Sequence, residues 1–417
     1  MNERLRFMKY KKIEGGAAAA KGFSAAGTAA GIKKNGNADM AMIACEKPCA
    51  LAGTFTTNLV KAAPVVWDMA FVREKRLARA VIVNSGVANA CTGKKGMEYC
   101  SATADAAGRA LGIDPSQVLV ASTGVIGQQL PIERITAGVE KLAGLLGTGK
   151  EKGTEAAKAI MTTDTVSKEC AAEMTFSDGT KAVLGGMTKG SGMIHPNMCT
   201  MLCFLTTDAA ISAELLQRAL SKVIPDTFNM LSVDGDTSTN DTCLLLADGL
   251  AGNAEIKEAD ADYEIFEETL RFVCESLARM MAKDGEGATC LFECRIQNAR
   301  TEKDAKLMAR SVVSSTLTKA AVAGHDANWG RILCAMGYSG AVFVPEKVDL
   351  SLESAAGKVE IMRAGFALDY SEEKATEILS ADEILCTADC HDGEAEASAW
   401  GCDLTHEYVS INADYRS

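Results

Sequence analysis

Apolar positions follow two kinds of spacing in the first half of the chain, one typical of strands and one typical of helices. Continuous apolar runs at 78–86 and 116–124 predict buried strands that lead into small-residue loops. Helical spacing between and after them predicts helices at 101–112 and 131–146. The Gly-rich and Lys-rich stretch 146–156 predicts a loop, and it lacks the strand and G-x-x-x-x-G-K-[ST] arrangement of a nucleotide-binding P-loop. Strands alternating with helices favour an α/β fold.

The second half continues this alternation. Residues 201–207 predict a buried strand, and 231–247 a polar loop that runs into another strand. Helical periodicity predicts helices at 211–224 and 262–283. Three short strands are predicted in the tail, at 341–345, 358–362 and 407–413.

Size and charge narrow the class of protein. A chain of 417 residues predicts two or three lobes. Its net charge of -12 argues against sequence-independent binding to nucleic acid or to an anionic membrane, both of which need a positive face. The chain shows neither an apolar run long enough to span a bilayer nor a secretory signal, so we expect a cytoplasmic protein.

The 15 cysteines are odd in number and spread along the chain, which favours reduced core thiols over a disulfide framework. Cys386-x3-Cys390 followed by Cys402-x3-His406 resembles a zinc pattern. Its gaps are loose, however, and the stretch "DLTHEYVSIN", which contains His406, is typical of an ordinary approach to a strand. We therefore expect no metal there.

The acidic stretch "SVDGDTSTND" also suggests a divalent metal, through Asp234, Asp236 and Asp241. An EF-hand loop would place a Glu at its twelfth position, where this chain has Leu245. A polar loop with internal hydrogen bonds is the preferred interpretation.

The step Cys199-Thr200 lies where a tight turn meets a predicted strand. A threonine hydroxyl is a poor nucleophile unless a base takes its proton, and the threonine's own α-amine can be that base once the preceding peptide bond is cut. The hydroxyl of Thr200 can attack the Cys199 carbonyl, and hydrolysis of the resulting ester would free residues 1–199. His195 is an alternative base, although a histidine that packs the turn is the preferred interpretation.

Taken alone, this stretch does not require catalysis. Thr200 is also explained as an ordinary β-branched residue that opens a strand, and this is the simpler interpretation of the stretch by itself. Three further features bear on the choice between the two.

The first is "VLVASTGVIG", where we expect a strand to end at Ala121 and a sharp turn to follow. The hydroxyl of Thr123 and the amide of Gly124 could then form an oxyanion hole. The second is Lys189, which precedes the Gly-rich turn and could hold a substrate carboxylate. The third is Glu286, between two glycines at a helix-to-strand transition, which could contact an amino group or could simply be a turn carboxylate.

Seven motifs follow one another along the chain in a specific order and spacing. They are "STGVIG", "AIMTTDT", "TKGSGMIHPNMCTML", "SVDGDTSTNDT", "KDGEGAT", "GHDANWGRI" and "YVSINADYRS". The set resembles the glutamate N-acetyltransferase (ornithine acetyltransferase) family of arginine biosynthesis, from about residue 10 to the C-terminus. A long ordered set of this kind is far more specific than any one motif.

The resemblance implies a fold and a reaction. The implied fold is a layered α-β-β-α sandwich of the self-processing N-terminal-threonine type, with a second α/β lobe. Cleavage would give an α chain, 1–199, and a β chain, 200–417, assembled as an α2β2 heterotetramer. The acetyl group of N2-acetyl-L-ornithine would pass to Thr200 and then to L-glutamate. No cofactor is implied, although acetyl-CoA could serve as a co-substrate.

The resemblance also implies roles for individual residues. Thr200 would be the nucleophile, and Thr123 and Gly124 the oxyanion pair. Substrate binding would involve Thr163, Lys189, Thr200, Glu286, Asn412 and Ser417. This chain departs from the family pattern at two positions, with Cys199 where Ala is usual and Ser417 where Thr is common.

Two other functions use some of the same features. A self-processing amidase or aminopeptidase would use the same nucleophile with water as the acceptor. A noncatalytic or metal-bound binding protein would leave the chain intact. The complete motif set favours acetyl transfer over both.

Overall fold

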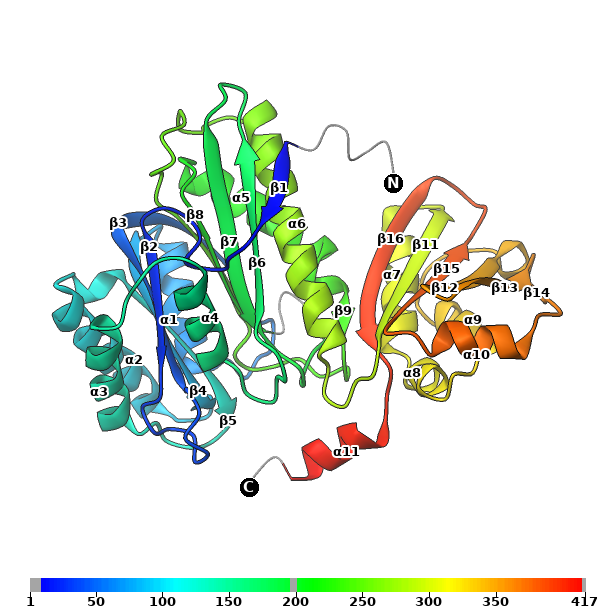
Figure 1. Ribbon diagram of the computed structural model, residues 1–417, viewed down its shortest axis with the longest axis horizontal. Helices are drawn as coiled ribbons and strands as arrows, with labels where there is room; N and C mark the ends of the chain where they lie inside the picture. Colours follow the sequence, from blue (N-terminus) through cyan, green and yellow to red (C-terminus); the bar gives the residue numbers. More distant parts are fainter. Residues whose placement is uncertain (1–8, 196–200, 415–417) are drawn as a thin grey trace. The chain divides into compact units, whose positions relative to one another are not determined.

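The computed structural model describes residues 9–195 and 201–414, which form two compact units. The first unit contains residues 9–190, 201–225 and 237–277, and the second contains 191–195, 226–236 and 278–414. Each unit therefore draws on chain segments from both sides of the predicted cleavage site. Figure 1 shows the helices and strands of each unit.

The first unit is organised around a nine-stranded sheet in the order β1-β6-β7-β8-β10-β3-β4-β5, with β2 paired to β3. Its strands are β1 (Tyr10–Ile13), β2 (Phe23–Thr28), β3 (Met40–Phe55), β4 (Ala78–Val87), β5 (Val118–Val125), β6 (Lys168–Thr175), β7 (Lys181–Lys189), β8 (Leu202–Thr207) and β10 (Thr242–Ala247). The long strand β3 pairs with β2 and β4 through its first half and with β10 through its second half. Its exposed middle, 46–48, and a register shift separate the two halves, so that β3 belongs to both layers.

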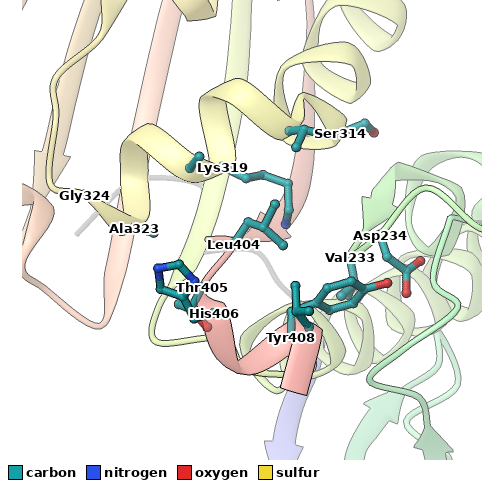
Figure 2. Close-up of a pocket in the computed structure, with 13 residues that line it drawn as sticks. Val233, Asp234, Ser314, Lys319, Ala323, Gly324, Leu404, Thr405, His406 and Tyr408 are labelled. Carbon is teal, nitrogen blue, oxygen red and sulfur yellow. The ribbon is translucent and has the colours of Figure 1, made fainter. Parts of the chain in front are cut away.

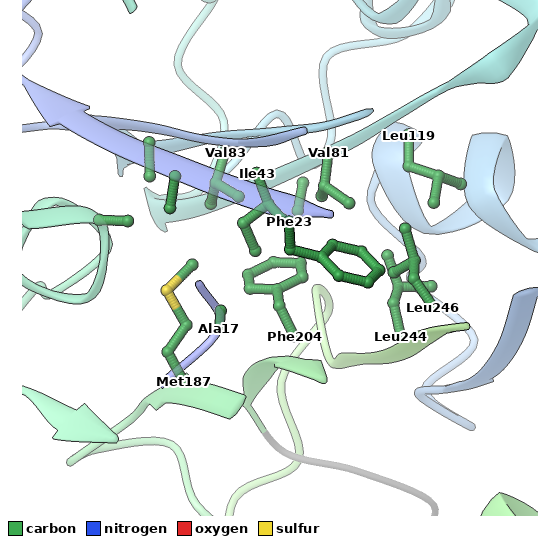
Figure 3. Packing of buried hydrophobic residues seen from close by; sticks show 14 of the residues in the cluster. Ala17, Phe23, Ile43, Val81, Val83, Leu119, Met187, Phe204, Leu244 and Leu246 are labelled. Carbon is green, nitrogen blue, oxygen red and sulfur yellow. The ribbon is translucent and has the colours of Figure 1, made fainter. Parts of the chain in front are cut away.

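The two halves of this sheet enclose the main apolar core (Figure 3). Phe23, Ile43 and Val81 come from one half, and Phe204 and Leu244 from the other, each at most 1% exposed. Burying a side chain of this size contributes about 1.5–3 kcal/mol relative to leaving it exposed. The sandwich interior therefore supplies much of the stability of the first unit.

Helices cover the outer faces of the sandwich. On the β3-β4-β5 half, a second apolar cluster packs α2 (Lys94–Leu111) and α3 (Ile132–Ala143) against the sheet, and α1 (Ala63–Arg73) contacts β3 and β5. On the other half, α5 (Ala213–Val223) packs against β3 and β10, while Leu277 of α6 (Ala261–Lys283) approaches Gly186 in β7. The helix–sheet–sheet–helix layering confirms the predicted α-β-β-α sandwich.

The second unit contains a seven-stranded mixed sheet in the order β14-β13-β12-β15-β11-β16-β9. Its strands are β9 (Leu231–Ser232), β11 (Leu291–Ala299), β12 (Asp349–Ser354), β13 (Gly357–Arg363), β14 (Phe366–Ala367), β15 (Glu383–Asp389) and β16 (Ala395–Cys402). Helix α7 (Glu302–Ser314) packs on β11 and β16, and α10 (Glu372–Leu379) on β12 and β13. Two short helices, α8 (Thr316–Ala323) and α9 (Trp329–Gly337), contact α7. This unit is the predicted second α/β lobe.

The prediction of a loop at 146–156 is wrong, because a helix, α4 (Lys150–Ala159), begins within it. Three alanines of α4 enter the sandwich core, so tertiary packing overrides the weak helix propensity of the Gly-rich stretch. Gly27 in β2 permits the close contact, since a Cβ there would lie 2.1 Å from the Glu155 carbonyl oxygen.

Two predicted strands in the tail are also wrong. Residues 341–345 form no strand, and the N–H of Val342 donates instead to an Asp304 carboxylate oxygen at 2.9 Å. Residues 407–413 belong to a helix, α11 (His406–Ala413), whose first turn is capped by Thr405 accepting from the Glu407 N–H at 3.2 Å. The alternating apolar residues of α11 resemble a strand pattern because no face of this helix is buried.

No helix within residues 9–195 and 201–414 is long and apolar enough to cross a membrane.

Candidate functional site

The predicted cleavage site, Cys199-Thr200, and the C-terminal Ser417 lie outside the described residues. The chain that follows the cleavage site is well held within the first unit. Met201 is 4% exposed, and its carbonyl accepts from the Thr242 N–H at 2.8 Å. Leu202, the first residue of β8, pairs with Lys189, the last residue of β7. The strand after the predicted nucleophile is therefore fixed on both sides.

Thr123 and Gly124 lie inside strand β5, which does not end at Ala121 as predicted. Gly124 has a φ of +130°, and the ladder to β4 becomes irregular around Gly86 and Val87. A Cβ on Gly124 would lie 2.2 Å from the Gly86 carbonyl carbon. The predicted sharp turn is replaced by a close approach of two strands, which glycine permits because it has no Cβ.

The structure brings Thr123 and Lys189 together. The Lys189 ammonium donates to the Thr123 hydroxyl oxygen at 3.2 Å, and these side chains are 9% and 8% exposed. A hydroxyl that accepts from an ammonium keeps its own proton available for another acceptor. Thr123 is thus prepared to donate, as an oxyanion hole requires.

A network of amide side chains supports this end of β5. Asn240 donates from Nδ2 to the Ser122 carbonyl at 2.7 Å and to the Ala88 carbonyl at 2.6 Å. The Ser122 hydroxyl donates to Asn84 Oδ1 at 2.6 Å. Asn84 in turn donates from Nδ2 to the Val87 carbonyl at 2.8 Å. These side chains are buried, so the backbone just before Thr123 is tightly held.

Thr163 lies in a loop that Asp164 attaches to the end of β7. The Asp164 carboxylate accepts from the Gly190 N–H at 2.7 Å and from the Lys168 ammonium at 2.7 Å. Burial raises the pKa of Asp164, but Lys168 and Lys189 outweigh it and lower that pKa to about 2. Asp164 is therefore a carboxylate at neutral pH, and it ties the Thr163 loop to the backbone directly after Lys189.

A cavity of about 570 Å³ adjoins the same loop and is lined by Thr162, Asp164 and Lys33, among others. The Lys33 ammonium donates to the carbonyls of Ala38 at 2.8 Å and Met161 at 2.7 Å. Burial lowers the pKa of Lys33 to about 8 despite the nearby carboxylate of Asp39. This cavity is therefore bordered by basic and acidic side chains.

In the second unit, the structure brings Glu286 and Asn412 together. Glu286 is 7% exposed, and its Oε2 accepts from Asn412 Nδ2 at 2.7 Å. A Cβ on Gly192 would lie 2.3 Å from an oxygen of this carboxylate, so the Gly-rich segment permits the close contact. The Glu286 N–H donates to the Ser191 carbonyl at 2.9 Å. Glu286 lies between the end of α6 and the start of β11, which confirms its predicted helix-to-strand placement.

His195 packs the turn. Its Nδ1 lies 3.0 Å from the Ser232 hydroxyl, and burial, aided by the charge of Arg310, lowers the pKa of His195 to about 4. Nearby, the Asp234 carboxylate accepts from the N–H groups of Met193 and Ile194, at 2.5 and 2.8 Å. A neutral, hydrogen-bonded histidine agrees with the turn-packing interpretation.

The second unit also contains a pocket of about 730 Å³ lined by residues of α8, α11 and the Val233-Asp234 segment (Figure 2). Buried Lys319, which is 2% exposed, donates from its ammonium to the Cys402 carbonyl at the pocket wall. Of the predicted site residues that the structure describes, none lines this pocket.

Within the described ranges, no group of three or more His, Cys, Asp or Glu side chains is arranged to hold a metal ion. Cys386 pairs in register with Cys294 on neighbouring strands, and both thiols are buried. Cys402 Sγ accepts from the Lys319 ammonium at 3.3 Å. Asp234 and Asp236 lie in the second unit, whereas Asp241 belongs to the first.

The model of the ArgJ family matches residues 24–417. The chain belongs to the ArgJ family. A curated ArgJ-family relative, named arginine biosynthesis bifunctional protein ArgJ, from Symbiobacterium thermophilum, is 51% identical over 407 residues, which cover 97% of this chain and 99% of the relative. The ArgJ 1 protein of Clostridium acetobutylicum is 49% identical over 395 residues, covering 95% and 96%.

Solved structures of ArgJ-family proteins are also similar. The Bacillus halodurans protein is 43% identical, with a TM-score of 0.48, and the match covers 50% of this chain and 97% of that chain. Membership of the ArgJ family confirms the family predicted from the ordered motifs. It also confirms the prediction of an acyltransferase of arginine biosynthesis with glutamate N-acetyltransferase activity.

Three residues that support the candidate site were not predicted. Asn240 lies in "SVDGDTSTND", where asparagine suggests a turn and its long-range acceptors leave no local signal. Asp164 and Lys168 are four residues apart and of opposite charge, a spacing that could have indicated a pair. Their complete burial, each with a 0% exposed side chain, was not visible in the sequence.

Proposed function

We propose that this chain cleaves itself before Thr200 and then transfers the acetyl group of N2-acetyl-L-ornithine to L-glutamate through an acetyl ester on Thr200. The observation that carries the proposal is the 3.2 Å contact from Lys189 to the Thr123 hydroxyl, beside Gly124 at the end of β5. It joins two residues to which the family resemblance gives roles and orients a hydroxyl as a donor. Membership of the ArgJ family supports the type of reaction. The contact from Lys189 to Thr123 supports the role of the Thr123 hydroxyl as a hydrogen-bond donor in it.

Self-cleavage begins when the Thr200 hydroxyl oxygen attacks the Cys199 carbonyl carbon. The C–N bond breaks, the amine of Thr200 takes the hydroxyl proton, and an ester joins the two segments. Water then hydrolyses the ester, giving residues 1–199 with a new carboxylate and residues 200–417 with a free N-terminal threonine. The small side chain of Cys199 is compatible with this step.

In the first half-reaction the freed α-amine accepts the proton of the Thr200 hydroxyl, whose oxygen attacks the acetyl carbonyl of N2-acetylornithine. Negative charge then develops on the acetyl oxygen, and the proposed donors to it are the Thr123 hydroxyl and the Gly124 N–H. Collapse breaks the amide bond, and the proton passes to the departing amine of ornithine. In the second half-reaction the amine of glutamate attacks the acetyl ester and restores the Thr200 hydroxyl.

Substrate binding in this proposal uses the charges of the described residues. Lys189 provides a cation for the α-carboxylate, and Thr163 lies on the loop that Asp164 attaches next to Lys189. Glu286 provides a carboxylate for the side-chain amine of ornithine, with Asn412 as its hydrogen-bond partner. Ser417, outside the described residues, completes the proposed set with its hydroxyl.

Two further parts of the proposal concern co-substrate and assembly. Acetyl-CoA could load the same Thr200 ester, and the curated relatives carry the word bifunctional in their names. The α and β chains should remain associated and pair as an α2β2 heterotetramer. Acetylation of Thr200 by acetyl-CoA in the absence of N2-acetylornithine tests the first point, and the mass of the native assembly tests the second.

The intact mass of the purified chains tests self-cleavage. Two fragments meeting at 199/200 are expected for the wild type, and Thr200→Ala should stay whole. An uncut wild-type chain with full activity would contradict the role of the freed amine.

Incubation with N2-acetylornithine, with and without glutamate, tests transfer. N-acetylglutamate should form only when glutamate is present, and trapped enzyme should carry an acetyl group on Thr200. Release of acetate at an unchanged rate without N-acetylglutamate would instead identify an amidase.

A further inference from the structure

Residues Asn240 to Thr242 connect the predicted oxyanion strand to the strand that follows the predicted nucleophile. At one end, Asn240 Nδ2 donates to the carbonyls of Ser122 and Ala88. At the other end, the Thr242 N–H donates to the Met201 carbonyl at 2.8 Å. Only Asp241 separates the two attachment points along the chain. A short, doubly anchored segment of this kind fixes the spacing between the elements that it joins.

We propose that Asn240 is a positioning residue for acetyl transfer. By holding the Ser122 carbonyl, it sets the direction of the Thr123 hydroxyl and the Gly124 N–H relative to the start of β8. This inference rests on the proposed roles of Thr123, Gly124 and Thr200. Asn240 itself contacts neither substrate nor the reacting atoms in this proposal.

Backbone geometry explains why the Ser122 carbonyl is the effective point of control. The peptide group is planar, so a fixed Ser122 carbonyl also fixes the N–H of Thr123. The next residue, Gly124, is conformationally permissive and has a φ of +130°. Without the hydrogen bond from Asn240, the end of β5 would therefore lose a restraint just before Gly124, whose backbone is easily distorted.

The chemistry of the site explains why this residue is an asparagine. An amide NH₂ has two protons, and Asn240 places one on each of two carbonyl oxygens. Its Oδ1 accepts from the Thr239 hydroxyl at 2.7 Å, so every polar group of this 6% exposed residue has a partner. An aspartate would set a carboxylate against two carbonyl oxygens, and an aliphatic residue would leave both without this donor.

Single-turnover kinetics of Asn240→Ala test the inference. Acetylation of Thr200 by N2-acetylornithine and deacetylation by glutamate should both slow by the same factor, about 10- to 100-fold, because both steps develop charge on the same acetyl oxygen. The concentration of each substrate at half-maximal rate should change little, since no binding group is removed. Unequal slowing of the two steps would overturn the inference.

Asn253→Ala is the control. Asn253 also belongs to the first unit and donates from Nδ2 to two carbonyls, those of Ala210 at 3.1 Å and Ala254 at 2.8 Å. The substitution removes two side-chain hydrogen bonds from a half-buried position elsewhere in the fold, and both half-reactions should keep their wild-type rates. If Asn253→Ala slows them as much as Asn240→Ala, the effect is general loss of stability and the inference fails.

A double-mutant cycle with Thr123→Ala separates positioning from stability. If Asn240 acts through Thr123, the double variant should lose clearly less rate than the product of the two single losses. A multiplicative loss would overturn the inference. Should Asn240→Ala not fold, Asn240→Ser keeps one hydroxyl donor and is measured in the same way. If neither variant folds, Asn240 is a stability residue and the inference is wrong.

These results are distinguishable from failure of the proposed function. If wild-type enzyme never carries acetyl on Thr200, the proposed function is wrong whatever the Asn240 variants do. If the wild type carries it and folded Asn240→Ala reacts at the wild-type rate, only the positioning role is wrong.

Discussion

In the first unit, Thr123 lies inside a buried strand whose neighbours are held by Asn84 and Asn240, whereas in the second unit Asn412 lies on α11, a helix with no buried residue. Thr123 is surrounded by groups that stabilise the fold as well as the site. Asn412 is held mainly through its contacts with Glu286 and with its own helix. The comparison shows that one set of proposed site residues is built into the core, and the other is attached to it. Mutations should therefore couple activity to stability in the first unit and separate them in the second.

The largest effect is expected from Gly124→Ala. The added Cβ would lie 2.2 Å from the Gly86 carbonyl carbon and 2.5 Å from its oxygen, so strands β4 and β5 would have to separate. Alanine keeps the backbone N–H, but this separation of the strands would displace it. Because loss of a well-placed oxyanion donor lowers kcat by about 10²–10³-fold, we expect a loss within this range together with reduced stability. The measurement is kcat with N2-acetylornithine and glutamate, alongside urea denaturation.

Gly127→Ala is the control for this substitution. Gly127 also has a positive φ, +83°, but a Cβ there would meet no atom within 4 Å. Its activity should stay near that of the wild type. Equal loss in both variants would mean that backbone strain, rather than the close approach to Gly86, explains the effect.

Lys168→Met should destabilise the first unit by about 3–5 kcal/mol, because it leaves the buried carboxylate of Asp164 without its paired charge. Both side chains of this pair are 0% exposed. Urea denaturation measures the change. Lys181→Met removes a comparable ion pair with Glu173 from a 59% exposed lysine and should cost less than about 1 kcal/mol. Similar losses in the two variants would contradict the importance of burial.

Asn412→Ala should show the opposite behaviour from Gly124→Ala. It removes the 2.7 Å hydrogen bond to Glu286 from a helix without buried residues. We expect kcat/KM for N2-acetylornithine to fall about 10-fold, the typical value of a hydrogen bond to a charged group, with stability unchanged. Ser410→Ala on the same helix is the control. A loss of stability in Asn412→Ala would show that α11 is integral to the second unit.

The smallest effect concerns pH. The pKa of His195 is lowered from 6.5 to about 4 in the folded protein, mainly by burial. As the pH falls from 7 towards 4, the unfolded chain binds a proton that the folded chain does not, so the free energy of unfolding decreases. His195→Asn should make this decrease between pH 7 and 5 measurably smaller. Identical pH dependence in wild type and variant would contradict the assignment.

Local pattern predicted the sandwich strands β4, β5, β8 and β10, whose central residues are buried on both faces. The apolar runs around Val81 and Leu119 became β4 and β5, whose stretches 80–83 and 118–121 are apolar and fully buried. Helix α4 and helix α11 were not predicted correctly for opposite reasons. Core contacts recruit the alanines of α4 despite its glycine, whereas α11 has no buried face to impose a helical period.

Candidate site residues could be proposed from the sequence where a single residue would carry the chemistry, and their roles stay predictions. Lys189 and Glu286 stand beside glycines, and those glycines are explained by close approaches, such as that of Gly192 to the Glu286 carboxylate. Asn240 and the pair Asp164–Lys168 were not predictable in this way. Their importance depends on partners and burial that only the folded chain defines.

The pairing of β7 with β8 and of β10 with β3 joins chain segments from both sides of the proposed cut within one hydrophobic core. If the chain is cut as proposed, the core would have to be built before the bond is broken. Each fragment made separately would expose the apolar faces that the other covers. The proposed self-cleavage would therefore occur only in molecules that have already folded.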